Sequence, residues 1–184
     1  MDAPFRGGNG VPAITPPDAH APRVLPAVPA PEDLRALRSA LGAFATGVTV
    51  ITAFEDRLPV GITVNSFASV SLDPPLVLWS VANTATCAEV FRAGTAFCVH
   101  VLAVGQDGLA MNFARSGGDK FGGLSWEHGD WGAPLLPGCT AEFHCEVDAR
   151  YPGGDHTIIL GKVLAHVVRE TPPLLFHRGH FREF

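Results

Sequence analysis

The chain of 184 residues is long enough for one domain with a sizeable buried core. Hydrophobic residues make up 47% of it, charged residues make up 17%, and the formal net charge is −5. This composition argues against a basic nucleic-acid groove or a polybasic membrane patch, and no apolar run reaches the roughly 18–20 residues that span a bilayer. We therefore expect a globular protein that binds neither nucleic acid nor membrane.

The first 31 residues differ in composition from the rest of the chain, because they hold eight of its sixteen prolines. Such a segment buries too little apolar surface to offset its ordering entropy, so residues 1–31 are predicted to be a flexible tail and residues 32–184 a single domain. No apolar core of signal-peptide type precedes the domain, and the four cysteines form no C-x-x-C pair. Buried reduced thiols and a cytoplasmic location are expected.

A helix is predicted from Pro31, with Leu34, Leu37, Leu41 and Phe44 on one apolar face and Gly47 as its end. Strand patterns then dominate the chain. They fall at residues 48–54, 59–72, 76–81, 96–102, 140–151 and 156–168, with short helices at 86–94 and 106–114 and a glycine-rich loop at 115–138. The fold class is therefore mainly β with peripheral helices, and the strand spacing favours a closed or nearly closed antiparallel barrel.

The stretch GITVNSFASVSLDPP (61–75) carries a polar face without charge. Hydroxyl, amide and backbone N–H groups can bind the edge of a flat heterocycle, or a phosphate, without burying a full positive charge. An ordinary solvated strand face explains the same residues equally well. The alternation breaks at Ser66, where we expect a bend that turns backbone N–H groups toward a ligand.

Three further segments carry candidate binding groups, each with a plain structural alternative. Residues 83–86 (Asn-Thr-Ala-Thr) precede a predicted helix and could hold an anion or simply cap it. Lys120, in an Asp-Lys-Phe sequence, could reach a phosphate or be solvated. His156 follows a Gly-Gly-Asp turn, where it could donate to a ligand or be incidental.

The end of the chain, Arg178-Gly179-His180-Phe181, offers a cation, close backbone approach and a ring for stacking, or is a frayed terminus. His177 and His180 lie three residues apart outside a clear helix, so no metal site is predicted. The dinucleotide fingerprint, the P-loop and the nucleophile elbow of hydrolases do not occur in the sequence.

Six blocks in this order resemble the short-chain flavin reductases that serve two-component monooxygenases. They are FATGVTVIT (44–52), VGITVNSFASVSLDPPLVL (60–78), FCVHVL (97–102), DKF (119–121), GGDH (153–156) and PLLFHRGHF (173–181). The resemblance covers about residues 32–181. It implies a flavin reductase-like, antiparallel split β-barrel that forms a homodimer, with the flavin near the subunit interface. The residue before Arg178 is often tyrosine in this family and is His177 here, which bears on the ring-stacking partner.

The resemblance also implies site residues. Flavin contacts are expected at Asn65, Ser66, Phe67, Ala68, Ser69, Val70, Leu72, Asp73, Asn83, Thr84, Thr86, Asp119, Lys120 and Phe121. Contacts to the nicotinamide cofactor are expected at His156, Arg178, Gly179, His180 and Phe181, with His156 as the catalytic residue.

The implied activity is hydride transfer from NADH or NADPH to FAD or FMN, with the reduced flavin passing to a partner monooxygenase. The chemistry belongs to the two cofactors, so the protein's task is to orient them. Two alternatives stay open: a non-catalytic split barrel that binds flavin or haem, and an enzyme like pyridoxamine-phosphate oxidase.

Overall fold

The computed structural model describes residues 31–183, with side chains from Leu34 onward. The chain divides into a unit that ends at Arg38 and a unit from Ser39 to Phe184. The tail expected over residues 1–31 lies outside the described residues except for Pro31. The helices are α1 (Pro31–Leu41), α2 (Ala88–Ala93) and α3 (Asp107–Ala114). None of the helices in residues 31–183 is long and apolar enough to cross a membrane.

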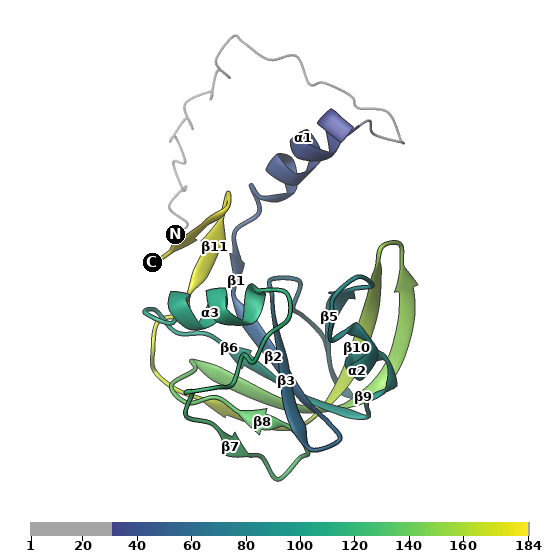
Figure 1. The fold of residues 1–184 in the computed structure, drawn as a ribbon, viewed down its shortest axis with the longest axis vertical. Coiled ribbons are helices and arrows are strands. Elements are labelled where there is room, and N and C mark those ends of the chain that lie inside the picture. Colours follow the sequence, from purple (N-terminus) through teal and green to yellow (C-terminus); the bar gives the residue numbers. More distant parts are fainter. Residues whose placement is uncertain (1–30, 184) are drawn as a thin grey trace, which may run out of the picture. The chain divides into compact units, whose positions relative to one another are not determined.

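Strands are the main secondary structure of the second unit (Figure 1). They are β1 (Thr46–Gly47), β2 (Thr49–Glu55), β3 (Leu58–Val64), β4 (Ala68–Leu72), β5 (Pro75–Ala82), β6 (Ala96–Val101), β7 (Glu127–His128), β8 (Pro134–Leu135), β9 (Ala141–Gly153), β10 (His156–Val168), β11 (Leu175–His177) and β12 (His180–Arg182). The main sheet has the order β3-β2-β6-β9-β10-β5-β4, and all of its pairs are antiparallel. A smaller sheet has the order β1-β11-β12.

The main sheet curls around one apolar core. Trp79 of β5 is fully buried and meets the rings of Phe91 and Phe97 edge-on, at centroid distances of 4.9 and 5.7 Å. Val60 and Ile62 of the edge strand β3 pack on the same cluster. Strands from both ends of the sheet order therefore share one core, as a nearly closed barrel requires, although within residues 31–183 no ladder joins β3 to β4. The predicted antiparallel β architecture is confirmed.

Helix α1 begins at Pro31 as predicted but ends earlier than the pattern suggested. It stops at Leu41, and the amide of Phe44 bonds to the carbonyl of Leu41 in a turn. Gly42 follows the last helical residue, and glycine is the common helix terminator. The prediction that Phe44 extends the apolar face and that Gly47 ends the helix is therefore wrong, because Gly47 belongs to β1.

The bend predicted at Ser66 is confirmed, because β3 ends at Val64 and β4 begins at Ala68. The alternation does not resume with its apolar side inward. Val70 is 47% exposed and Leu72 is 95% exposed, and the register of β4 shifts between Ser69 and Ser71. The loop predicted at 115–138 is confirmed in outline, but it also contains the short β7–β8 pair, which pattern reading missed.

The four cysteines are buried free thiols, as predicted. Burial raises the pKa of Cys139 and of Cys145 to about 12, so both are neutral thiols at ordinary pH. Burial also raises the pKa of Cys98, with Glu142 acting in the same direction.

A buried histidine makes part of the fold's stability depend on pH. His100 of β6 is completely buried, and its Nε2 accepts a hydrogen bond from the Leu136 amide at 3.3 Å. Its Nδ1 has no partner among the described residues. Desolvation, reinforced by His144 and Arg169, lowers the pKa of His100 from 6.5 to about 3. Between these two pH values His100 is therefore protonated in the unfolded chain and neutral in the folded chain.

His100 does not reduce the free energy of unfolding above pH 6.5. As the pH falls from 6.5 toward about 3, that free energy declines because the unfolded chain takes up a proton on His100. Between pH 7 and pH 5 we expect wild type to lose about 2 kcal/mol of unfolding free energy more than His100→Gln, because glutamine keeps an acceptor but does not titrate. Urea denaturation of both proteins at both pH values measures this difference. Equal losses for the two proteins would show that His100 is not the titrating group.

Candidate functional site

The outer face of the edge strand β3 is covered by helix α3. The Thr63 hydroxyl donates to the carbonyl of Ala110 at 2.7 Å, and a side chain at Gly61 would collide with the Phe113 ring. Part of the uncharged face seen in the sequence therefore contacts a helix of the same chain. Gly61 is required here because the helix packs directly on the backbone.

The Lys120 side chain joins this strand to this helix. Its ammonium donates to the carbonyl of Gly61 at 3.2 Å and to the carbonyl of Phe113 at 3.0 Å. Desolvation lowers the pKa of Lys120, Arg115 lowers it further, and Cys87 has the opposite effect. An ammonium has three N–H donors, so one remains for a ligand after the two carbonyls are satisfied.

The residues beside Lys120 fix its loop. The Asp119 carboxylate accepts from the amides of Phe121 and Gly122 at 2.9 and 2.8 Å, which closes a tight turn. The Phe121 ring is buried and meets Phe113 edge-on at 5.0 Å. Three predicted flavin residues lie in this loop. Asp119 fixes the backbone turn and Phe121 packs in the core, whereas Lys120 has one N–H group left for a ligand.

A cavity of about 170 Å³ lies beside Lys120 at one end of β3. Two predicted residues from distant parts of the chain, Thr86 and Lys120, line it together. We call it cavity 1; its lining is Glu55, Pro59, Val60, Gly61, Thr86, Cys87, Gly117, Gly118, Asp119, Lys120 and Phe121. A hydroxyl, an ammonium and glycine backbone around such a volume suit a phosphate group.

A second cavity, of about 240 Å³, lies at the other end of β3, and we call it cavity 2. It brings together Asn65, predicted for the flavin, and Phe181, predicted for the nicotinamide cofactor. Its lining is Val48, Thr63, Val64, Asn65, Ala110, Met111, Ala114, Phe176 and Phe181. These side chains are mostly apolar, with one amide at the edge, which suits a flat ring. Val60 lines cavity 1 and Val64 lines cavity 2. These two residues are four positions apart on β3, which is roughly 13 Å along a strand.

The turn between β9 and β10 forms a third group of predicted residues. Asn83 donates to the carbonyl of Gly154 at 3.3 Å and accepts from the Thr157 hydroxyl at 2.9 Å. His156 is half-buried, and its Nδ1 lies 2.6 Å from the Asp155 carboxylate. Asn83 therefore anchors this turn. The expectation that residues 83–86 cap α2 is wrong, because Cys87 is the N-cap and makes no side-chain capping bond.

Two residues of the predicted flavin segment have structural contacts in this chain. The Ser66 hydroxyl accepts from the amide of Ser80 at 3.0 Å and lies 3.3 Å from its carbonyl, to which it donates. The Phe67 ring packs on the core and stacks on Phe143 at 5.6 Å. These contacts pin the bend to β5, so the side chains of Ser66 and Phe67 serve the fold.

Several predicted residues line neither cavity. Ala68, Ser69, Val70 and Leu72 form the exposed edge strand β4, and Asp73 lies in the turn after it. Arg178 and Gly179 form the tight turn between β11 and β12, both with positive φ, and the pairing of these two strands means that residues 178–181 are not frayed. His180 and Thr84 are exposed. Figure 1 shows the β11 turn and the β9–β10 turn on opposite sides of the upper part of the view.

Sequence reasoning missed other residues of the cavities. Glu55, Pro59 and Cys87 line cavity 1, and Met111 and Phe176 line cavity 2. Glu55 falls between the predicted strands at 48–54 and 59–72, where nothing in the sequence marks it as a ligand-binding residue. No spacing in the sequence links the turn at Glu55 to the loop at Lys120, because the sheet and helix α3 bring them together.

Comparison with known proteins agrees with this geometry. A profile described as flavin reductase like domain matches residues 41–184. The chain is 50% identical over 157 residues to the FMN reductase (NADH) SmoA of Agrobacterium fabrum, covering 85% of this chain and 90% of that protein. It is 42% identical to the flavin-dependent monooxygenase reductase subunit HsaB of Rhodococcus jostii, covering 81% of this chain and 77% of that subunit.

The fold is likewise similar to solved structures of flavin reductases. The NADH:FAD oxidoreductase SgcE6 of Streptomyces globisporus, in complex with NAD and FAD fragments, superposes with a TM-score of 0.81 at 40% identity and covers 89% of this chain and 97% of that one. A match to the family profile over most of the chain, with relatives this similar over most of their length, establishes the family. The chain belongs to the flavin reductase-like family and has its split-barrel fold.

Proposed function

We propose that this protein is an NADH-dependent flavin reductase that delivers reduced flavin to a partner monooxygenase. One observation carries the proposal: a polar cavity with a partly buried lysine and an apolar cavity with an amide lie at the two ends of one strand. This pairing suits a molecule with a phosphate at one end and a flat ring at the other. The relatives with NADH, FMN and FAD in their names support the same cofactors.

The residues of cavity 1 fit the phosphate of a flavin. The free N–H of Lys120 and the Thr86 hydroxyl supply charge and hydrogen bonds there, and Asp119 holds the loop in place. Backbone amides of residues 65–70 suit the edge of the ring, where they would stabilise negative charge that develops on reduction.

The nicotinamide side is assigned to His156 and to the turn at residues 178–181. Asn65 and Phe181 line one cavity, which supports contact between the two rings at that place. When bound, the flavin accepts hydride at N5 from C4 of the nicotinamide. The protein's own contribution is to hold both rings in contact and away from water, which makes the transfer effectively unimolecular.

Purified protein supplied with NADH and FMN or FAD should consume NADH catalytically and bleach the flavin absorbance near 450 nm under anaerobic conditions. The wild-type protein is expected to turn over with at least one of the two flavins. Absence of turnover with both would rule out the reductase assignment and favour a flavin-storing barrel. Boiled protein serves as the blank, because free flavin reacts slowly with NADH by itself.

Lys120 and His156 should affect different substrates. Lys120→Met should raise the KM for flavin about tenfold or more, because it removes one charged hydrogen bond to the phosphate. His156→Ala should raise the KM for NADH about tenfold and the KM for flavin less. Lys162→Met is the matched control, since Lys162 lies on β10 and pairs with Glu146 at 3.2 Å outside both cavities. The opposite split between the two substrates would mean that the ligands are assigned to the wrong residues.

We further propose that the protein is a homodimer located in the cytoplasm. The edge strand β4 exposes Val70 and Leu72, which a monomer would leave in water. The buried free thiols suit a reducing compartment.

Sedimentation equilibrium at micromolar concentration should give twice the chain mass of 19.4 kDa. Leu72→Asp should weaken association, because it places a charge on the exposed apolar strand. A wild-type monomer at this concentration would contradict the dimer, and an unchanged dimer in the variant would move the interface away from β4.

A further inference from the structure

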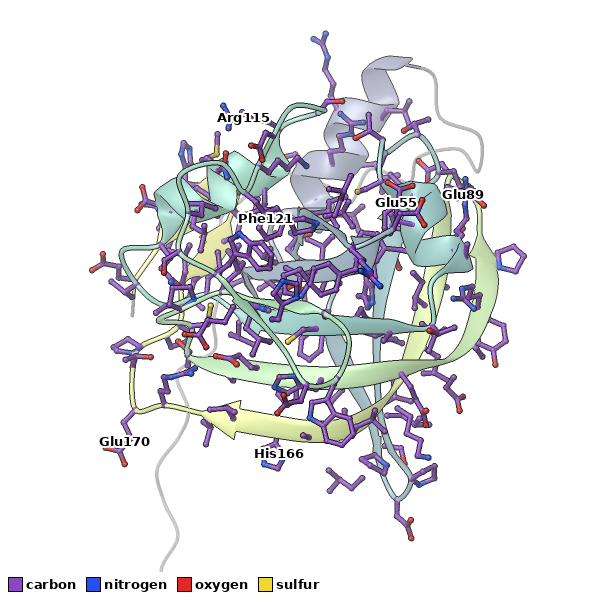
Figure 2. All side chains as sticks on the ribbon, turned by 60° about the horizontal axis from the view of Figure 1, so that its bottom comes forward. Glu55, Glu89, Arg115, Phe121, His166 and Glu170 are labelled. Carbon is purple, nitrogen blue, oxygen red and sulfur yellow. The ribbon has the colours of Figure 1, made fainter. Side chains whose placement is uncertain are left out.

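Cavity 1 has a charged residue at its mouth that the proposed function does not use. Glu55 is the last residue of β2; its side chain is exposed, and it lines the cavity together with the loop that carries Lys120. The neighbouring residues Asp56 and Arg57 form the hairpin turn, carry opposite charges and do not line the cavity. In Figure 2 Glu55 lies on the same side of the view as Glu89 of helix α2, and Phe121, which is buried, lies nearer the centre.

Three charged residues line this cavity, and they lie at different depths. Asp119 is exposed, and one of its carboxylate oxygens accepts from two backbone amides of its own loop. The Lys120 side chain is half-buried and bound to the backbone of Gly61 and Phe113, whereas Glu55 is exposed. Both act on the buried Cys87 thiol: burial raises its pKa, Lys120 opposes the rise and Glu55 adds to it. The cavity therefore has a positive inner end and a negative mouth.

FMN and FAD differ in where they carry negative charge. The monoester phosphate of FMN holds close to two charges on one group, whereas FAD divides two charges between two linked phosphates and adds an adenosine. A volume of about 170 Å³ holds a phosphate group but not an adenosine as well. The second phosphate of FAD must therefore extend through the mouth, past Glu55.

Resting on the proposed function, we propose that Glu55 makes this protein select FMN over FAD. The inner end of cavity 1 attracts the concentrated charge of FMN through Lys120. The mouth repels the outer phosphate of FAD through Glu55, and no lining residue of the cavity supplies a cation at the mouth. Arg115, the C-cap residue of α3, acts on Lys120 but does not line the cavity.

The test is the ratio of kcat/KM for FAD to kcat/KM for FMN, measured with NADH at low ionic strength. Wild type should favour FMN. Glu55→Gln should raise the FAD/FMN ratio about threefold to fivefold, and Glu55→Lys should raise it further, because the charge at the mouth is removed or reversed. Both effects should shrink at 0.5 M salt, since the mouth is open to solvent. Neither variant disturbs the core, because the side chain is exposed.

Glu170→Gln is the matched control, because it removes the same charge from an exposed position far from Glu55 in Figure 2. Its FAD/FMN ratio should equal that of wild type. A ratio that stays constant in both Glu55 variants, that changes equally in Glu170→Gln, or a wild type that favours FAD, would overturn the inference while leaving the reductase assignment intact. No turnover by wild type with either flavin would instead remove the proposed function itself.

Discussion

The Lys120 ammonium holds the candidate site together by bonding two backbone carbonyls from different elements. One belongs to Gly61 on the edge strand β3, and the other belongs to Phe113 at the end of α3. An edge strand normally leaves such carbonyls to water or to another chain. Here the lysine satisfies the carbonyl of Gly61, and the same cation remains available at the wall of a cavity. Stability of the edge and affinity for an anion are thus linked through one side chain.

Close packing between α3 and β3 follows from small and aromatic residues at matching positions. Gly61 lets the Phe113 ring lie on the strand, and Phe121 closes against that ring from the loop. Asp119 fixes the turn that aims Lys120 back at the strand. The two cavities are the spaces left at the ends of this contact, so their distance apart is set by the length of β3 and not by flexible loops.

The sequence predicted the long elements well because their patterns are local. The hairpins β2–β3 and β9–β10 have clear alternation and turn residues, and their positions are confirmed. The predicted end of α1 was wrong because the helix stops before Gly42, although the apolar spacing in the sequence continues to Phe44. The exposure of Val70 and Leu72 was not predictable from alternation, because a register shift between Ser69 and Ser71 interrupts the pattern within β4.

Residue types in the sequence predicted part of the candidate site. The fold determines which of the predicted residues line each cavity. Lys120 and Thr86 meet in one cavity and Asn65 and Phe181 in another, although each pair is distant in sequence. Ser66 and Phe67, chosen for their side chains, use those side chains to fix a bend. The place of Glu55 in cavity 1 was not predicted, because a carboxylate beside a hairpin turn has no sequence pattern that indicates ligand binding. Contacts between distant segments carry this information, and a single sequence does not show them.

The central claim is that cavity 1 holds the flavin phosphate through Lys120 and Thr86. A crystal structure of the protein with FMN tests this most directly. The account predicts phosphate density within hydrogen-bond distance of the Lys120 ammonium, with the ring extending toward Asn65. A phosphate bound elsewhere on the barrel, with cavity 1 filled by water, would contradict it.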